Sequence, residues 1–304
     1  MPQGEPRFGR MIPAMVTPFN EKLELDLDRA QQLADRLVKG GSDALIVNGT
    51  TGESPTVFYP QKMELFKAVV SAVDGRVPVI ANVGDNCTAD TVDFAHDVEK
   101  TGVDGFMCVV PYYNKPPQEG LYQHFSTIAR SVDLPIILYN IPGRCVINMT
   151  AETTLRLASD CDNIVAIKEA SGKMNQIKDI VDAAPEGFCV FSGDDSATLD
   201  IMKLGGVGVI SIGRVDRRDL PVVQRGEEPA AQVVVDRPAV VGVDQRVVPQ
   251  LGALVDVRDA GHRQLQQLLP ERVRPAVRCD PAHEGRDLRV GRGVVEGGVD
   301  HGVQ

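Results

Sequence analysis

Short runs of apolar and β-branched residues recur along the first 212 residues, separated by longer amphipathic segments. The runs predict eight β-strands, at 11–16, 44–48, 78–82, 105–110, 135–139, 164–168, 189–192 and 207–211. Between them, apolar residues recur at helical spacing, as at Leu27, Ala30, Leu33 and Leu37 before Gly40. Alternation of strands and helices indicates a parallel sheet, because parallel neighbours need a crossover connection.

Eight strand–helix repeats favour a closed barrel over an open doubly wound sheet. The open sheet more often carries a GxGxxG turn after its first strand, and this sequence has none there. We therefore expect an α/β fold, a (β/α)8 TIM barrel that forms the catalytic domain over residues 1–212. In such barrels the catalytic groups stand at the carboxyl ends of the strands, where this sequence is rich in polar residues.

The composition changes after Ile212. Residues 213–304 contain no Lys, Ser, Thr, Asn, Ile, Met, Phe or Tyr, yet they contain 20 Val and 14 Arg. Strands favour Ile, Thr and aromatic residues, and helix caps favour Ser, Thr and Asn, so an evolved domain seldom lacks all of these types. We interpret 213–304 as an atypical Val/Arg/Gly-rich tail from a shifted reading frame, disordered and without a recognisable eighth barrel helix. A natural low-complexity extension is the alternative.

Charge and hydropathy argue against two classes of binding partner, nucleic acids and membranes. The formal net charge is −10, and it resides wholly in 1–212 because the 14 arginines of the tail are matched by 14 acidic residues. A negative chain does not attract the phosphates of nucleic acids. No apolar stretch approaches the roughly 18 residues that span a bilayer, and the first 20 residues lack a basic segment followed by an apolar h-region. We expect a cytoplasmic protein with no nucleic-acid or membrane partner, whose cysteines are reduced core residues.

The clearest candidate for chemistry is Lys168, at the end of the apolar run 164–167. If Ile167 points outward, Lys168 points into the barrel mouth. A desolvated lysine loses its proton more readily, and the neutral amine can attack a ketone to form a Schiff base. An ion pair with Glu169, or a bound phosphate, is the alternative. Tyr139 ends the preceding strand, where a phenol could move protons for that amine or serve only as a rim residue.

Two further strand ends suit carboxylates. Thr50 and Thr51 lie in a turn flanked by glycines, which combines hydroxyls with backbone N–H groups. An ordinary turn with a helix cap is the alternative. Arg144 offers a planar fork for a second carboxylate, unless it forms a surface ion pair. His96 and His124 lie on predicted helices without a ligand-spaced partner, so we expect structural or solvated histidines and no metal site.

Five motifs occur together in a fixed order: GTTGES at 49–54, PYYNKP at 111–116, YNIPGR at 139–144, IKEASG at 167–172 and SGDD at 192–195. As a set they resemble the dihydrodipicolinate synthase family of Schiff-base class I aldolases. The resemblance covers about residues 7–212, and the C-terminal 90 or so residues do not match. It implies a lyase that condenses pyruvate with L-aspartate semialdehyde in the diaminopimelate route to lysine. It further implies a homotetramer, a dimer of dimers, that needs no cofactor.

The resemblance also implies roles for individual residues. Lys168 matches the Schiff-base lysine, and Tyr139 matches a tyrosine that relays protons with Thr51 and with Tyr113 of a neighbouring subunit. The substrate-binding positions are Thr50 and Thr51 for the pyruvate carboxylate, Arg144 for the semialdehyde carboxylate, and the backbone of Gly193 and Ile210 for the pyruvate pocket. The positions that match an allosteric lysine site are Ser54, Asn86, Asp90 and Tyr112. Feedback by lysine stays open, because the neighbouring positions Tyr59 and Lys62 vary within the family.

Two other functions remain open at this point. One is a sister pyruvate-dependent aldolase, of the N-acetylneuraminate lyase or 2-keto-3-deoxy sugar acid aldolase type, which would share Lys168 and Tyr139. Arg144 and the Thr50-Thr51 doublet argue against it. The other is an inactive product that keeps the motifs but has a disrupted C-terminus, and the composition of 213–304 supports it.

Overall fold

A computed structural model describes residues 6–211 of the chain. Its strands are β1 (Met11–Pro13), β2 (Leu45–Val47), β3 (Val79–Asn82), β4 (Gly105–Val109), β5 (Ile136–Asn140), β6 (Ile164–Glu169), β7 (Cys189–Ser192) and β8 (Gly208–Ser211). Its α-helices are α1 (Leu27–Lys39), α2 (Tyr59–Val73), α3 (Thr88–Glu99), α4 (Gln118–Ser131), α5 (Pro142–Cys145), α6 (Ala151–Asp160), α7 (Met174–Ala183) and α8 (Thr198–Lys203). Two 3-10 turns, η1 (Ser54–Thr56) and η2 (Asp195–Ala197), follow β2 and β7.

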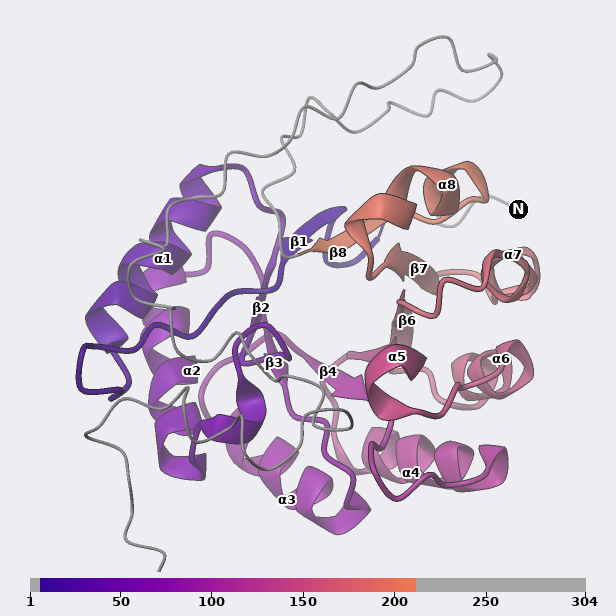
Figure 1. Cartoon of the computed structure of the whole chain (residues 1–304), viewed down its shortest axis with the longest axis horizontal. Coiled ribbons are helices and arrows are strands. Elements are labelled where there is room, and N and C mark those ends of the chain that lie inside the picture. Colours follow the sequence, from indigo (N-terminus) through magenta and orange to yellow (C-terminus); the bar gives the residue numbers. More distant parts are fainter. Residues whose placement is uncertain (1–5, 212–304) are drawn as a thin grey trace, which may run out of the picture. The chain divides into compact units, whose positions relative to one another are not determined.

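The eight strands form one parallel sheet in the order β1-β8-β7-β6-β5-β4-β3-β2. Its two ends meet just after β1, where Ala14 makes a parallel bridge to Ile46 and the Met15 N–H donates to the Ile46 carbonyl at 2.9 Å. Figure 1 shows the resulting ring of strands with the helices around it. The predicted (β/α)8 barrel is confirmed for the described residues.

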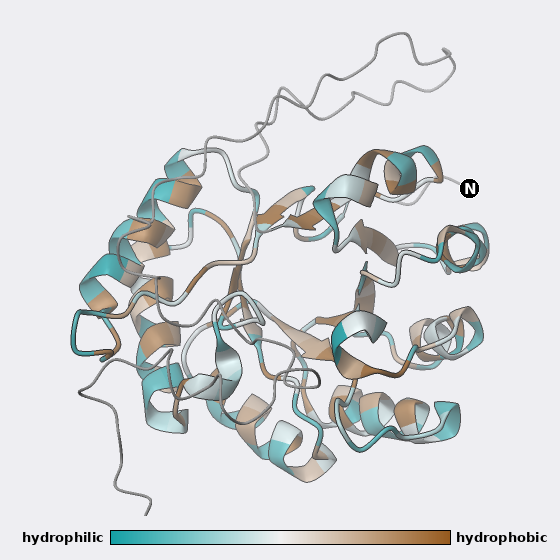
Figure 2. Ribbon diagram, in the orientation of Figure 1, coloured by the Kyte–Doolittle hydropathy of each residue, from teal (hydrophilic) through white to brown (hydrophobic). Residues whose placement is uncertain are grey.

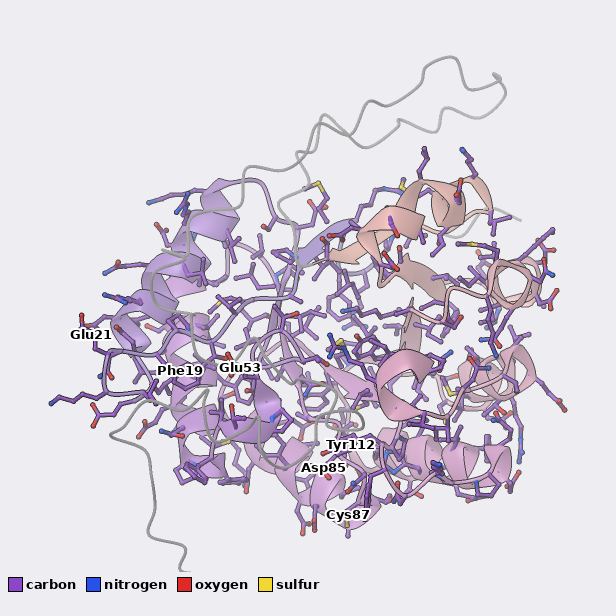
Figure 3. All side chains as sticks on the ribbon, viewed as in Figure 1. Phe19, Glu21, Glu53, Asp85, Cys87 and Tyr112 are labelled. Carbon is purple, nitrogen blue, oxygen red and sulfur yellow. The ribbon has the colours of Figure 1, made fainter. Side chains whose placement is uncertain are left out.

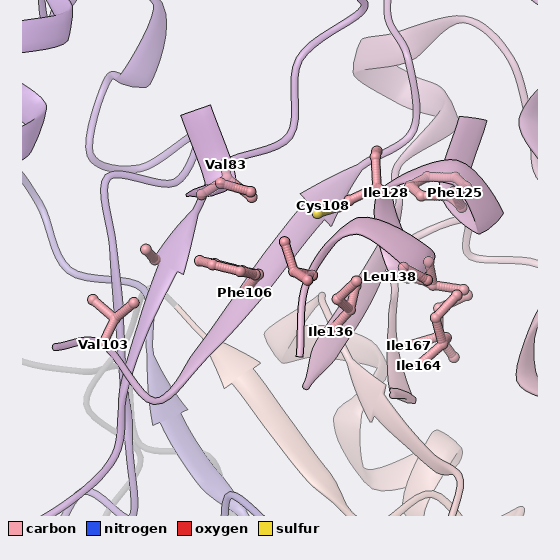
Figure 4. Packing of buried hydrophobic residues seen from close by; sticks show 14 of the residues in the cluster. Val83, Val103, Phe106, Cys108, Phe125, Ile128, Ile136, Leu138, Ile164 and Ile167 are labelled. Atoms are coloured by element: carbon pink, nitrogen blue, oxygen red, sulfur yellow. The ribbon is translucent and has the colours of Figure 1, made fainter. Parts of the chain in front are cut away.

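Strand alternation gives the barrel two hydrophobic regions. Inward-facing residues such as Ile80, Met107 and Ile137 fill the interior, and a larger cluster lies between the strands and the helices. Figure 4 shows part of this outer layer, with Phe106 and Leu138 among the buried residues between the sheet and α4. Helix faces toward the sheet are hydrophobic and outer faces are hydrophilic (Figure 2).

Local sequence signals explain where the helices begin and end. The Asp26 side chain accepts a hydrogen bond from the Arg29 N–H and caps α1, and Gly40 ends the helix as the spacing predicts. The Thr150 side chain caps α6 in the same way, with the Thr153 N–H as donor. Helix α6 therefore starts at a fixed point after α5, the short helix that carries Arg144.

The predicted strands agree with the structure to within a few residues, with one clear exception. The first strand was expected at 11–16 but ends at Pro13, because the chain then turns from pairing with β8 to pairing with β2. Short α5, between β5 and α6, was not predicted. The expectations for 213–304, including the missing eighth helix, lie outside the described residues.

The described residues, 6–211, contain five cysteines. Of the five cysteines there, Cys108, Cys145, Cys161 and Cys189 are buried, as expected for small core residues. Between residues 6 and 211 no helix is both long and apolar enough to cross a membrane.

Candidate active site

The barrel interior ends in two polar side chains at the carboxyl ends of β5 and β6. Tyr139 and Lys168 are direct partners in the register of these strands, and their side chains are 4% and 5% exposed. The Lys168 Nζ lies 4.4 Å from the centroid of the Tyr139 ring. Ile167 packs in the outer cluster, so the expected inward direction of Lys168 is confirmed.

Burial governs the charge of the Lys168 amine. Desolvation lowers its pKa to about 8; the negative charge of Asp195 opposes the shift and the positive charge of Arg144 adds to it. About a tenth of the amine is therefore neutral at pH 7, and the neutral form is the one that attacks a carbonyl.

Tyr139 has the opposite shift. Burial raises the pKa of its phenol to about 12, while the charge of Arg144 and a side-chain hydrogen bond with Thr50 pull it down. The phenol keeps its proton at neutral pH, so it can donate to an oxygen near the amine. The threonine that lowers the Tyr139 pKa is Thr50, the first of the doublet, whereas the resemblance pairs Tyr139 with Thr51.

Gly193 and Ile210 border the lysine from two other strands. A Cβ on Gly193 would lie 2.9 Å from the Ala170 Cβ and 3.1 Å from both the Cγ and the Cε of Lys168, so a larger residue there would press on the extended lysine side chain. Ile210, on β8, is fully buried in the interior cluster. Both positions therefore lie around the candidate nucleophile, as expected from the motifs.

The alternative partner for Lys168 does not pair with it. Glu169 follows Lys168 on β6, so its side chain leaves the strand on the other face. Its carboxylate accepts hydrogen bonds from the Ser171 N–H at 2.7 Å and from the Asn140 amide at 3.2 Å. The proposed Lys168–Glu169 ion pair is wrong, because strand alternation separates the two groups.

Arg144 and Tyr113 are both exposed. Arg144 lies on α5, directly after β5, and its charge affects both Lys168 and Tyr139. Tyr113 is 87% exposed and has a positive φ of 73°. Within one chain the structure does not bring Tyr113 to the buried Tyr139.

The expected allosteric residues lie together, away from Lys168. Ser54 and Asp90 line a hollow of about 300 Å³ together with Lys62 and Asp85. Tyr112 borders this group, because its hydroxyl donates to the Asp85 carboxylate at 3.1 Å. Figure 3 labels the two residues close to each other. The Asn86 amide donates to the Tyr112 carbonyl at 3.2 Å.

The two histidines make ordinary contacts. His124 is buried on α4 with its Nδ1 2.8 Å from the Thr88 hydroxyl, and burial lowers its pKa to about 4. His96 is exposed and contacts the Ser131 carbonyl. In the segment 6–211 no three His, Cys, Asp or Glu side chains are placed to hold a metal ion.

Sequence reasoning missed two features of the site. Asp195 was quoted only as part of a motif, yet its charge acts on Lys168. Asn140 was quoted without a role of its own and Glu169 only as a possible ion-pair partner of Lys168, yet the two form a register pair on the outer face of the sheet. The signal for the second feature was present, since two polar residues follow the inward pair at adjacent strand ends.

Comparison with known proteins identifies the family. The model of the dihydrodipicolinate synthetase family matches residues 7–214. The 4-hydroxy-tetrahydrodipicolinate synthase 1 of Halalkalibacterium halodurans is 56% identical over 205 residues, which are 67% of this chain and 69% of that protein. The corresponding synthase of Bacillus subtilis is 51% identical over 205 residues, 67% of this chain and 71% of that protein.

Solved structures agree with this match. The crystal structure of DHDPS from Cyanidioschyzon merolae with lysine bound has a TM-score of 0.67 and 51% identity, over 67% of this chain and 70% of that one. The family match ends at residue 214, so the expectation that the C-terminal 90 or so residues do not match is confirmed. Over the matched residues, this chain belongs to the dihydrodipicolinate synthetase family.

Proposed function

We propose that this chain is a lyase of the 4-hydroxy-tetrahydrodipicolinate synthase type, which condenses pyruvate with L-aspartate semialdehyde. The reaction would serve the diaminopimelate route to lysine. The observation that carries the proposal is the buried pair Lys168 and Tyr139, with the amine pKa lowered to about 8 and the phenol pKa raised to about 12. Membership of the family supplies the substrates.

In this proposal the neutral Lys168 amine attacks the ketone carbon of pyruvate. The ketone oxygen takes a proton from Tyr139 and, after a second protonation, leaves as water, so that an imine joins Lys168 to the substrate. Loss of a methyl proton turns the imine into an enamine, and its carbon adds to the aldehyde. The amine of the second substrate then attacks the imine carbon, which closes the ring and releases the free Lys168 amine.

The roles that we propose for Thr50 and Thr51 differ from those that the resemblance implies. Because Thr50 makes the hydrogen bond to the phenol, we assign Thr50 to the proton relay with Tyr139. Thr51 then holds the pyruvate carboxylate together with the backbone of the 49–54 turn. The backbone around Gly193 and Ile210 closes the pyruvate pocket. Arg144 receives the carboxylate of the semialdehyde.

The exposed Tyr113 supports assembly with a second copy. An aromatic side chain that is 87% exposed and held in a left-handed backbone conformation suits a contact with a neighbouring subunit. We therefore propose that Tyr113 completes the proton relay of a partner in a dimer, and that two dimers form a tetramer.

The hollow beside Tyr112 supports a lysine site. Its four aspartates, Asp85, Asp90, Asp93 and Asp97, suit an ammonium group, and Ser54, Asn86 and Tyr112 add polar contacts. A relative from Cyanidioschyzon merolae has been solved with lysine bound. The ammonium of Lys62 also lines the hollow and opposes the binding of a second cation. Calorimetric titration of the full chain with lysine tests the proposed site.

Borohydride trapping tests the proposed function directly. The full chain is incubated with pyruvate and borohydride, and we expect one reduced pyruvate on Lys168, seen by peptide mass spectrometry. Lys168→Ala should lose the label. A label on another lysine, with Lys168 unmodified, would falsify the assignment. Faster turnover of N-acetylneuraminate than of pyruvate with semialdehyde would move the chain to the sister aldolases.

A further inference from the structure

A buried carboxylate lies directly behind the candidate nucleophile. The Glu169 side chain is completely buried. Its carboxylate oxygens act as acceptors in the following hydrogen bonds. Its Oε1 accepts from the Ser171 N–H at 2.7 Å, both oxygens accept from the Asn140 amide at 3.2 Å, and Oε2 accepts from the Gln176 amide at 3.4 Å. Burial raises the pKa of this carboxyl, and the hydrogen bonds oppose that shift. A group surrounded by N–H donors is an acceptor in the folded protein.

Asn140 extends these contacts to the segment between α5, which carries Arg144, and α6. Its Oδ1 accepts from the Met149 N–H at 3.1 Å, and its Nδ2 lies 3.1 Å from the Asn148 Oδ1. The Asn148 amide in turn donates to the Gln176 Oε1 at 2.7 Å. The buried Glu169 and Asn140 and the half-buried Asn148 and Gln176 therefore form one network, which joins β5, β6, the 146–150 segment and α7.

The register between β5 and β6 links this network to the candidate catalytic pair, Tyr139 and Lys168. Tyr139 pairs with Lys168 on the inner face, and the next register pair, Asn140 with Glu169, points to the outer face. A shift between β5 and β6 that breaks the outer pair also displaces the phenol from the amine. The outer pair is therefore placed to fix the inner one.

On the other side of Glu169, the register partner Ser192 of β7 is also polar and buried, but its hydroxyl donates to the Asp194 carbonyl. At the ends of β3 and β4, the corresponding outward positions in the helix layer hold Val83 and Val110, both buried and apolar. A buried carboxylate stabilises a fold less than a well-packed apolar group of the same size. Stability alone would favour an apolar residue at position 169 too.

We propose that Glu169 is a positioning residue for the Schiff-base reaction. Acting through Asn140, it holds the Tyr139 phenol against the Lys168 amine; acting through Asn140 and Asn148, it fixes the segment that follows Arg144. The inference rests on the proposed function, since it assigns Glu169 a part in imine formation at Lys168. Glu169 itself does not touch substrate.

The first test is Glu169→Gln, which keeps the size of the side chain. The introduced NH2 group faces the donors of Asn140 or Gln176, so one of these contacts becomes repulsive. We expect the rate of borohydride-trapped imine formation, per folded molecule of full-length chain, to fall by about 10- to 100-fold, because small displacements of reacting groups slow reactions strongly.

Rescue separates positioning from general stability. In the double variant Glu169→Gln with Asn140→Asp, the introduced amide donates to the introduced carboxylate. The Asn148 amide, whose Oδ1 faces position 140, turns its NH2 group toward that carboxylate, so the contacts are complementary again with the same total charge. We expect at least a tenfold recovery of the trapping rate relative to Glu169→Gln alone. The matched control is Asn163→Ala at the other end of β6, where the amide donates to the Ala129 and Val132 carbonyls at 2.9 Å. It should lower the melting temperature and leave the trapping rate unchanged.

The outcomes distinguish this inference from the proposed function. If the wild-type chain forms no imine on Lys168, both fall. If the wild-type chain forms it and Glu169→Gln traps pyruvate at the wild-type rate, only the positioning role is overturned. The role is also overturned if Asn163→Ala slows trapping as much as Glu169→Gln does, or if the double variant stays as slow as Glu169→Gln.

Discussion

The two ends of the barrel interior are both buried, but they differ in chemistry. At the amino ends of the strands, Phe8 packs with Ala44, Cys189 and Val207 in an apolar base. A Cβ on Gly105 would lie 2.7 Å from the Phe8 Cζ, so the ring fills the space that this glycine leaves. At the carboxyl ends, the same interior finishes in a phenol and an amine.

The difference shows which end stabilises the barrel and which end opposes folding. Burying an aromatic ring contributes about 2–3 kcal/mol. The Lys168 pKa, which falls from 10.5 to about 8, corresponds to about 3 kcal/mol against folding when the amine is charged. Burial of the Lys168 amine at the carboxyl end of the barrel therefore lowers the stability of the fold. The apolar amino-terminal end and the helix layer provide the compensating stability.

The largest effect should come from the mouth. Tyr139→Phe removes the proton donor beside Lys168, and we expect imine formation to slow by about 10²- to 10⁴-fold with the melting temperature nearly unchanged. The rate of pyruvate trapping measures this. The matched control is Tyr122→Phe, a buried tyrosine on α4 whose hydroxyl donates to Asp160 at 2.8 Å. An equal slowing in both variants would show that the phenol beside Lys168 has no special part.

A substitution at the apolar amino-terminal end of the barrel should lower stability and leave the reaction rate unchanged. Phe8→Ala leaves a cavity and should lower the free energy of unfolding by about 3–5 kcal/mol. The trapping rate should stay at the wild-type value at temperatures where the variant is folded, because Phe8 lies at the opposite end of the barrel from Lys168. Denaturant melts and trapping on the same samples measure both quantities, and Phe8→Leu should show a smaller loss. A slower trapping rate in folded Phe8→Ala would mean that the two ends are coupled.

Removing the charge at the mouth should stabilise the fold. The folded pKa of Lys168, about 8, lies below the unfolded value of 10.5, so the unfolded state binds more protons between these pH values. The penalty is complete below about pH 8 and disappears as the pH rises to about 10.5. Lys168→Met should thus be more stable than the wild type by up to about 3 kcal/mol at pH 7, with a gap that narrows above pH 8.

Denaturant melts at pH 7 and pH 10 measure this gap. The exposed Lys178, paired with Asp182 on α7, provides the control Lys178→Met, which should change stability little at either pH. A Lys168→Met variant less stable than the wild type at pH 7 would contradict the assigned cost of the buried amine.

The barrel could be predicted from sequence because its signals are local. Apolar runs of strand length, helical stripes and the glycine at position 40 each appear within a few residues. The end of β1 could not be predicted, because Ala14 changes partner from β8 to β2, and no local pattern encodes which distant strand lies beside it.

The site was predicted only in part, for a related reason. Lys168 and Tyr139 were found because each ends an apolar strand, but the choice between Thr50 and Thr51 depends on how the 49–54 turn meets β5. The network around Glu169 needs four residues from separate elements to meet behind the sheet. The strand register pairs Asn140 with Glu169, and the packing of α7 and of the segment before α6 brings Gln176 and Asn148 to them.

The smallest effect should separate the two substrates within the mouth itself. Arg144→Ala removes one charged donor at an exposed position, and we expect the KM for the semialdehyde to rise by about 30-fold, or about 2 kcal/mol. Trapping with pyruvate alone should change little, since Arg144 acts on the Lys168 amine only through its charge. The exposed Arg156 on α6, which pairs with Glu119, gives the control Arg156→Ala. If Arg144→Ala slowed pyruvate trapping and left the KM for the semialdehyde unchanged, Arg144 would belong to the first half-reaction.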